Sequence, residues 1–172
     1  MEEQENVLSK SWDIKLIAAK TFQLSVFVGL AVAAPYFLNQ LITGSIVNAL
    51  LFISASTLGL ESAFLLCLVP SLISIYTGLL PLALAPMIPF IMTGNALLVL
   101  SFYFLRKKYW VGAISSSIIK FIFIWSVGML LANSILHGIA SKVMLMISWP
   151  QLATALLGAC IAFLFLKTTR KI

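Results

Sequence analysis

Lys120 is the residue of this sequence whose chemistry stands out first. It lies in the middle of the apolar stretch SSSIIKFIFIW, which runs from Ser115 to Trp125. A lysine ammonium group offers three hydrogen-bond donors and no acceptor. The five acidic residues of the chain lie at positions 2–13 and at Glu61, away from this stretch. Without a counter-charge, Lys120 either loses its proton or binds an incoming anion such as a carboxylate or a phosphate.

Neutral polar side chains occur at a similar depth in other apolar stretches. Asn48 and Asn95 lie near the centres of two of them, and Ser74 lies farther along a third. These residues either bind the neutral polar edges of a ligand or join helices by hydrogen bonds. Lys120 has the same two interpretations: it contacts a ligand, or it donates a structural hydrogen bond, for example to Asn95. A third interpretation lets its long stem reach toward the membrane surface.

The helical periodicity around Lys120 predicts which way its side chain points. Ser116 and Ser117 precede it by four and three residues, so they lie on the same face of a helix. Ile122 and Trp125 lie on other faces and suit lipid. A charge at the centre of a bilayer costs about 2.5–3.5 kcal/mol on insertion scales, so such residues usually face the helix bundle. We therefore expect Lys120 to point inward.

Further polar and aromatic residues gather in the segments between apolar stretches. Asn39 follows the first stretch, Trp149 and Gln151 begin the last, and three prolines lie within positions 81–89. Backbone interrupted by proline is tolerated in a membrane only where it is buried or lines a cavity. The sequence thus predicts a cavity that opens toward these segments, although Trp149 also suits an interfacial aromatic belt. The residues expected to bind a ligand are Asn39, Asn48, Ser74, Asn95, Lys120, Trp149 and Gln151.

The elements that must position these residues are membrane-spanning helices. The chain has 172 residues, of which 62% are hydrophobic and 9% charged, and its mean hydropathy is +1.11. A soluble domain has about 25% charged residues. A membrane span needs about 20 mostly apolar residues. Residues 1–15 are too polar for a span, so we expect them to form a cytosolic lead-in, an interfacial helix capped by Ser11.

Residues 16–172 are predicted to form one membrane domain of the all-α class with six spans. These spans are Leu16–Pro35, Leu41–Leu58, Ser62–Leu80, Leu84–Leu105, Tyr109–Asn133 and Ile147–Leu166.

The distribution of basic residues predicts the orientation of this six-helix bundle. Cytoplasmic segments carry the excess of Lys and Arg in membrane proteins. With the N-terminus inside, Lys142 is the one basic residue in an outer loop, and Lys20 and Lys120 lie within helices. Both termini are therefore expected in the cytosol. The inner segments hold the remaining eight of the eleven basic residues, namely Lys10, Lys15, Arg106, Lys107, Lys108, Lys167, Arg170 and Lys171.

Motifs for enzyme chemistry are missing from the sequence. It has no G-x-x-x-x-G-K-[ST] phosphate-binding loop, no pair of carboxylates within an apolar stretch, and no His/Cys cluster for zinc. Cys67 and Cys160 lie in apolar stretches and are read as small core residues. We expect no catalytic residue, no cofactor, no metal and no nucleic-acid partner.

One stretch resembles a known family of transport proteins. PMIPFIMTGNALLVLSFYFLRKK, with Gly94 and Asn95, is similar to the fourth-helix region of substrate-binding (S) components of energy-coupling factor transporters. The six-helix architecture with both ends inside resembles the same family over the whole chain. Members often carry an Ala-x-x-x-Ala motif in the first helix, and here Ser25, Gly29 and Ala33 occupy such spacing instead. This small-residue stripe suits partner docking or packing inside the monomer.

The resemblance implies a function and partners. It implies a multi-pass protein of the prokaryotic plasma membrane that captures a vitamin or related micronutrient outside the cell. It further implies docking on a transmembrane coupling protein and two ATPase subunits, which would perform any ATP hydrolysis. Two other classes remain open: a stand-alone secondary carrier or channel subunit, and a non-catalytic membrane assembly protein.

Overall fold

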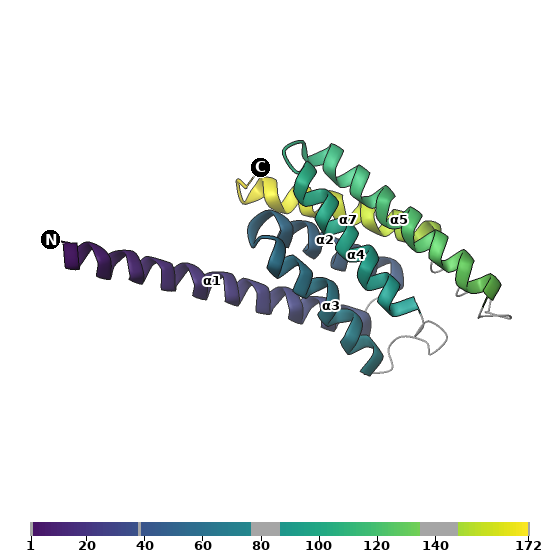
Figure 1. Cartoon of the computed structure of the whole chain (residues 1–172), viewed down its shortest axis with the longest axis horizontal. Helices are drawn as coiled ribbons and strands as arrows, with labels where there is room; N and C mark the ends of the chain where they lie inside the picture. Colours follow the sequence, from purple (N-terminus) through teal and green to yellow (C-terminus); the bar gives the residue numbers. More distant parts are fainter. Residues whose placement is uncertain (1, 38, 77–86, 135–147, 172) are drawn as a thin grey trace.

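The computed structural model describes residues 2–37, 39–76, 87–134 and 148–171 of the chain. All regular secondary structure in these ranges is helical. Figure 1 shows the arrangement of the helices. In chain order they are α1 (Glu2–Phe37), α2 (Gln40–Thr57), α3 (Leu60–Tyr76), α4 (Ile88–Leu105), α5 (Tyr109–Ser134) and α7 (Trp149–Thr168).

Four of the helices are long and apolar enough to cross a membrane, as in a multi-pass membrane protein. These stretches are Ile14–Tyr36, Ile88–Leu105, Tyr109–Leu131 and Trp149–Thr168. Two shorter apolar helices, Leu41–Thr57 and Leu60–Ile73, belong to α2 and α3. The expectation of an all-helical membrane protein is therefore confirmed.

Among the described residues, the predicted helix bounds lie close to the observed ones except at the start of α1. The predicted bounds Leu80, Leu84 and Ile147 lie outside the described residues. Helix α1 runs without a break from Glu2 through Ser11, so Ser11 does not cap it. The segment before Pro35 holds neither glycine nor proline until Gly29, and nothing in it interrupts helical hydrogen bonding. Figure 1 shows the first half of α1 extending beyond the other helices. Two of the three predicted loop prolines, Pro81 and Pro86, lie outside the described residues.

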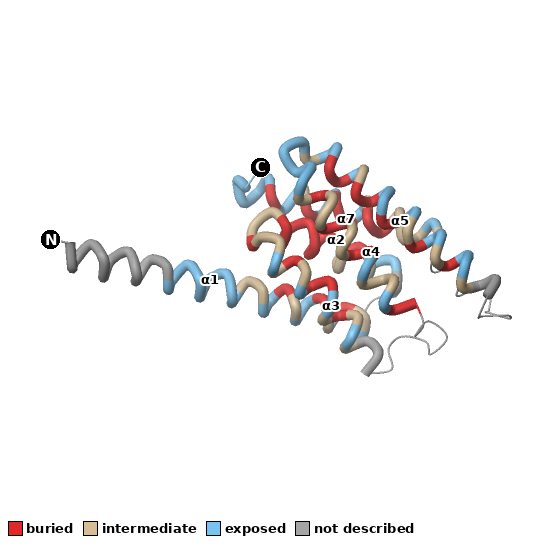
Figure 2. The backbone as a smooth tube through the Cα atoms, viewed as in Figure 1, coloured by how far each residue is buried: buried red, intermediate tan, exposed pale blue. Residues whose placement is uncertain are grey.

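The core of the bundle lies between α2, α4, α5 and α7. The most extensive contacts join α2 to α7 and α4 to α5, and the buried residues in Figure 2 follow these contacts. Cys67 of α3 is fully buried, but Cys160 of α7 is exposed, so the prediction that both are core residues is wrong for Cys160. Large side chains such as Ile122 and Trp125 are exposed on the outer surface, where lipid would cover them.

Glycines allow the closest approaches between helices. A Cβ atom built on Gly158 of α7 would lie 2.7 Å from Asn48 Cβ and 2.8 Å from the Ala49 nitrogen of α2. On Gly94 of α4 it would lie 2.8 Å from the side chain of Ile124 in α5. Small residues serve this purpose in membrane helix packing. The two contacts fix how α2 and α4 present their central asparagines.

Candidate functional site

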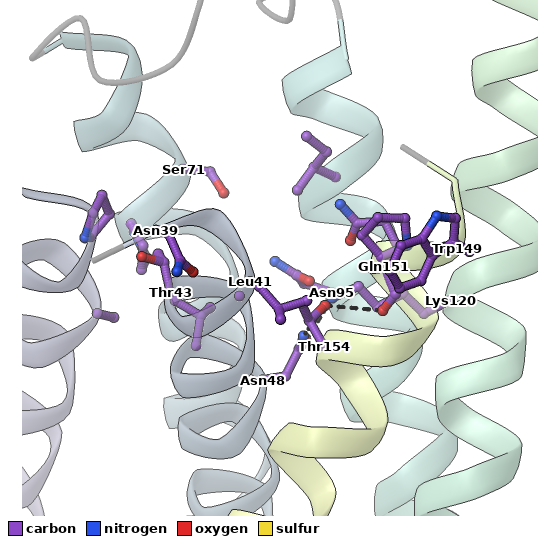
Figure 3. A pocket seen from close by; sticks show the side chains of 17 residues that line it. Asn39, Leu41, Thr43, Asn48, Ser71, Asn95, Lys120, Trp149, Gln151 and Thr154 are labelled. Atoms are coloured by element: carbon purple, nitrogen blue, oxygen red, sulfur yellow. Dashed lines mark hydrogen bonds between the residues drawn. The ribbon is translucent and has the colours of Figure 1, made fainter. Parts of the chain in front are cut away.

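A cavity of about 550 Å³ opens at one end of the bundle, within the size range of small-molecule sites. All six described helices line it. It lies among the C-terminal parts of α1 and α3, the N-terminal halves of α2, α4 and α7, and the middle of α5 (Figure 3). Its lining includes Pro35, Asn39, Leu41, Thr43, Val47, Asn48, Pro70, Ser71, Ile91, Asn95, Lys120, Trp149, Gln151 and Thr154.

Lys120 reaches this cavity from α5 and is almost completely buried, with 3% of its surface exposed. Its inward orientation agrees with the sequence prediction. The ammonium Nζ donates a hydrogen bond of 2.6 Å to Asn48 Oδ1 in α2. Ser116 and Ser117 share its buried helical face, but their hydroxyl groups donate to the Ala113 carbonyl of their own helix. Asn48 is thus the partner of Lys120, and the proposed bond to Asn95 does not form.

Asn48 links Lys120 to the last helix through a short chain of hydrogen bonds. Its Nδ2 atom donates to Thr154 Oγ1 at 3.3 Å, and Thr154 Oγ1 donates to the Gln151 carbonyl at 3.1 Å. The chain runs from α5 through α2 into the second turn of α7 (Figure 3). Asn48 therefore orients both the ammonium group and Thr154. Thr154 was not among the predicted binding residues, although it lies three residues after Gln151 and hence on the same helical face.

Asn95 of α4 lines the same cavity but lacks a partner for its carbonyl oxygen. The side chain is 5% exposed, and its Oδ1 atom is buried with no hydrogen-bond partner among the described residues. A buried acceptor without a donor costs about 1–3 kcal/mol. At the cavity, Asn95 Oδ1 can therefore accept a hydrogen bond from a ligand, beside the helix that carries Lys120.

The charge around the cavity is positive. Among the described residues that line it there is no Asp or Glu to oppose Lys120. The helix N-termini of α2 and α7 also lie at the cavity, and helix N-termini carry partial positive charge. Of the three donors of the Lys120 ammonium group, one is used within the described residues, in the hydrogen bond to Asn48 Oδ1. The site is therefore built to favour an anionic or strongly electronegative group.

Six of the seven predicted binding residues line this one cavity. The side chain of Ser74 lies outside the described residues, while Ser71, one turn earlier in α3, lines the cavity. Asn39 also caps α2, because its Oδ1 atom accepts a 3.0 Å hydrogen bond from the Ile42 nitrogen. Trp149 lies at the cavity with 60% of its surface exposed. Their roles toward a ligand remain predictions.

The predicted docking stripe lies on the outer surface of α1. Ser25, Gly29 and Ala33 are all exposed, and a Cβ atom on Gly29 would have no heavy atom within 4 Å. The opposite face of α1 packs into the bundle through Phe27 and Ala31. The stripe therefore does not pack within the monomer.

Clusters for metal binding are absent from the described residues, where no group of three His, Cys, Asp or Glu side chains gathers.

No protein-family model, curated protein or solved structure matches the chain.

Proposed function

We propose that this chain is the membrane-embedded substrate-capture subunit of an importer of the energy-coupling factor type. Its substrate would be a vitamin or related micronutrient that carries an anionic group. The observation that carries the proposal is Lys120, a buried ammonium group in a cavity without an acidic residue among its described lining. Intramembrane ionisable residues of this kind mark substrate or ion pathways.

The cavity suggests how such a substrate is held. Its anionic group would accept hydrogen bonds from the free donors of Lys120, each worth about 1.5–3 kcal/mol as a bond to a charged group. A neutral N–H or O–H of the substrate would donate to Asn95 Oδ1, which has no partner among the described residues. The apolar side chains of Leu41, Val47 and Ile91 would cover the remaining surface. Among the described residues of the lining, no carboxylate is present to bind a cation.

The proposed orientation places the cavity on the outer side of a prokaryotic plasma membrane. In this topology the six helices all cross the membrane and both termini are cytosolic. The basic residues Arg106, Lys107 and Lys108 between α4 and α5 then lie inside, with those of the C-terminus, which agrees with the positive-inside rule. The substrate would enter from outside without crossing the apolar core.

Release into the cell would require partner subunits, because the sequence holds no phosphate-binding loop. We propose that a transmembrane coupling protein docks on the exposed stripe of Ser25, Gly29 and Ala33, and that two ATPase subunits supply the energy. The chain itself would bind its substrate without acting as an enzyme. An exposed small-residue stripe permits the close helix approach that such docking needs.

The experiment that tests this function has two parts. Mass spectrometry of the small molecules that co-purify with the full chain should reveal an organic anion. Proteoliposomes that contain the chain alone should bind this molecule without accumulating it, and those that also contain a coupling module should accumulate it with ATP. Accumulation by the isolated chain would contradict the proposal and favour a stand-alone carrier.

A further inference from the structure

The end of the bundle opposite the cavity brings the start of α5 against the end of α7. Tyr109 Oη donates a 2.6 Å hydrogen bond to the Ala159 carbonyl of α7. The rings of Tyr109 and Phe163 lie 5.3 Å apart between their centroids. These contacts hold the connection that precedes α5 beside the last turns of α7, as Figure 1 shows.

Five exposed cations belong to the two segments that meet at this junction, and we call them the basic cluster: Lys107, Lys108, Lys167, Arg170 and Lys171. The neighbouring Arg106 is engaged elsewhere, since its Nη1 atom donates to the Ala55 carbonyl at 3.1 Å. Glu61, on the first turn of α3, is the only acidic side chain among those that the structure describes. The cluster therefore presents a strong excess of positive charge.

An aromatic surface adjoins the basic cluster. Trp110 of α5 and Phe163 of α7 form a tilted pair with centroids 4.9 Å apart, and Trp110 is 43% exposed. Lys167 Nζ lies 6.0 Å from the centroid of the Phe163 ring. Tryptophan beside basic residues is typical of the boundary between lipid tails and headgroups. The cations and the rings thus offer both a charged and an apolar half of one binding surface.

Arg170 occupies a backbone position that favours glycine. Its φ is +53°, and the turn closes with hydrogen bonds from Arg170 N to the Lys167 carbonyl and from Lys171 N to the Leu166 carbonyl. Glycine is the usual residue at this left-handed position after a helix. The chain instead places a guanidinium group there, at the cost of some backbone strain. Arg170 therefore adds a cation to the basic cluster at a position where the backbone geometry favours glycine.

We infer that the basic cluster and the Trp110–Phe163 pair bind one anionic phospholipid. The headgroup phosphate would accept hydrogen bonds from the cations, and an acyl chain would lie along the two rings. Basic residues between membrane helices on the cytoplasmic side commonly recognise such headgroups. A free phosphate would leave the rings unused, and a zwitterionic lipid offers less net charge. This site is separate from the cavity and does not depend on the substrate proposed for it, but it rests on the proposed orientation, which places these cations on the cytosolic side.

Native mass spectrometry of the full chain in detergent tests this inference. The chain is mixed with equal amounts of phosphatidylglycerol and phosphatidylcholine, and retention of each lipid is measured. The wild type should retain phosphatidylglycerol preferentially. Lys108→Gln, Lys167→Gln and Arg170→Gly should each lower this preference about fivefold, the scale of one cation near an anionic surface. Lys20→Gln, an exposed lysine of α1 outside the cluster, should leave the preference unchanged.

Thermal unfolding separates lipid binding from a structural role of the cations. Arg170→Gly relieves the left-handed backbone, so its unfolding temperature should equal or exceed that of the wild type while its lipid preference falls. Equal retention of the two lipids by the wild type would overturn the inference and leave topology or an acidic protein as the reason for the cations. Complete displacement of phosphatidylglycerol by millimolar inorganic phosphate would also overturn it, because a lipid that is held by the rings as well as by the cations should be retained against free phosphate.

Discussion

The hydrogen bond between Lys120 and Asn48 permits a double-mutant cycle on stability that needs no ligand. Asn48→Leu keeps the approximate volume of the side chain but leaves the buried ammonium group without its 2.6 Å acceptor. A hydrogen bond to a charged group contributes about 1.5–3 kcal/mol. We therefore expect Asn48→Leu to lower the free energy of unfolding by at least this amount.

Lys120→Met should behave differently, since two effects oppose each other. It leaves Asn48 Oδ1 without its donor, which costs about 1–3 kcal/mol. It also removes a buried charge, which recovers about 2.5–3.5 kcal/mol on insertion scales. The net change should lie near zero or be stabilising. In the double variant the loss caused by Asn48→Leu should largely disappear.

Reversible unfolding in mixed detergent micelles, followed by tryptophan fluorescence, measures the four free energies of the cycle. The coupling energy should reach about 1.5–3 kcal/mol. Neutral hydrogen bonds between membrane helices average only about 0.6 kcal/mol in such cycles. A coupling energy at or below that average would refute the argument that Asn48 holds a charged Lys120.

Three further predictions concern packing, docking and topology. Gly158→Ala should lower the free energy of unfolding by about 1–3 kcal/mol, because its Cβ would lie 2.8 Å from the Ala49 nitrogen. Gly29→Ala, with nothing within 4 Å, should leave it unchanged or raise it by up to about 1 kcal/mol, because alanine favours a helix more than glycine does. Gly29→Leu should weaken assembly with a coupling module, measured by co-purification, and leave substrate affinity unchanged; unaltered assembly would argue against docking on this stripe. Lys107→Cys is made in a chain whose two natural cysteines are replaced by alanine. The new cysteine should react with a membrane-impermeant maleimide only after the cells are opened. Labelling of intact cells would contradict the six-span topology.

The sequence predicted the helices well because their signal is local. Apolar stretches of about 20 residues and the breaks between them depend only on nearby residues. Lys120 was also placed correctly on an inward face, since its neighbours Ser116 and Ser117 repeat with the helical period. The predicted start of α1 was wrong. The charged residues before Asp13 mark the end of the apolar stretch, but the helical hydrogen bonds continue through them to Glu2.

The contacts between helices could not be predicted in the same way. Asn48 and Asn95 lie at similar depths, and only the rotation of α2 and α4 decides which of them meets Lys120. That rotation follows from close approaches such as the one at Gly158, which joins residues far apart in the sequence. Thr154 was not predicted because a hydroxyl group in an apolar helix commonly donates only to the backbone of its own helix. The Thr154 hydroxyl does donate to the Gln151 carbonyl, but it also accepts a hydrogen bond from Asn48 Nδ2.

The affinity of Lys120→Met for the small molecule extracted from the wild-type chain tests the central claim most directly. Isothermal titration calorimetry on both purified proteins gives the comparison, with Lys20→Met as the control for loss of an exposed lysine. We predict that Lys120→Met folds at least as well as the wild type and binds the molecule roughly 10- to 150-fold more weakly, which corresponds to about 1.5–3 kcal/mol. An unchanged affinity in a folded Lys120→Met protein would show that Lys120 is structural and would contradict the account.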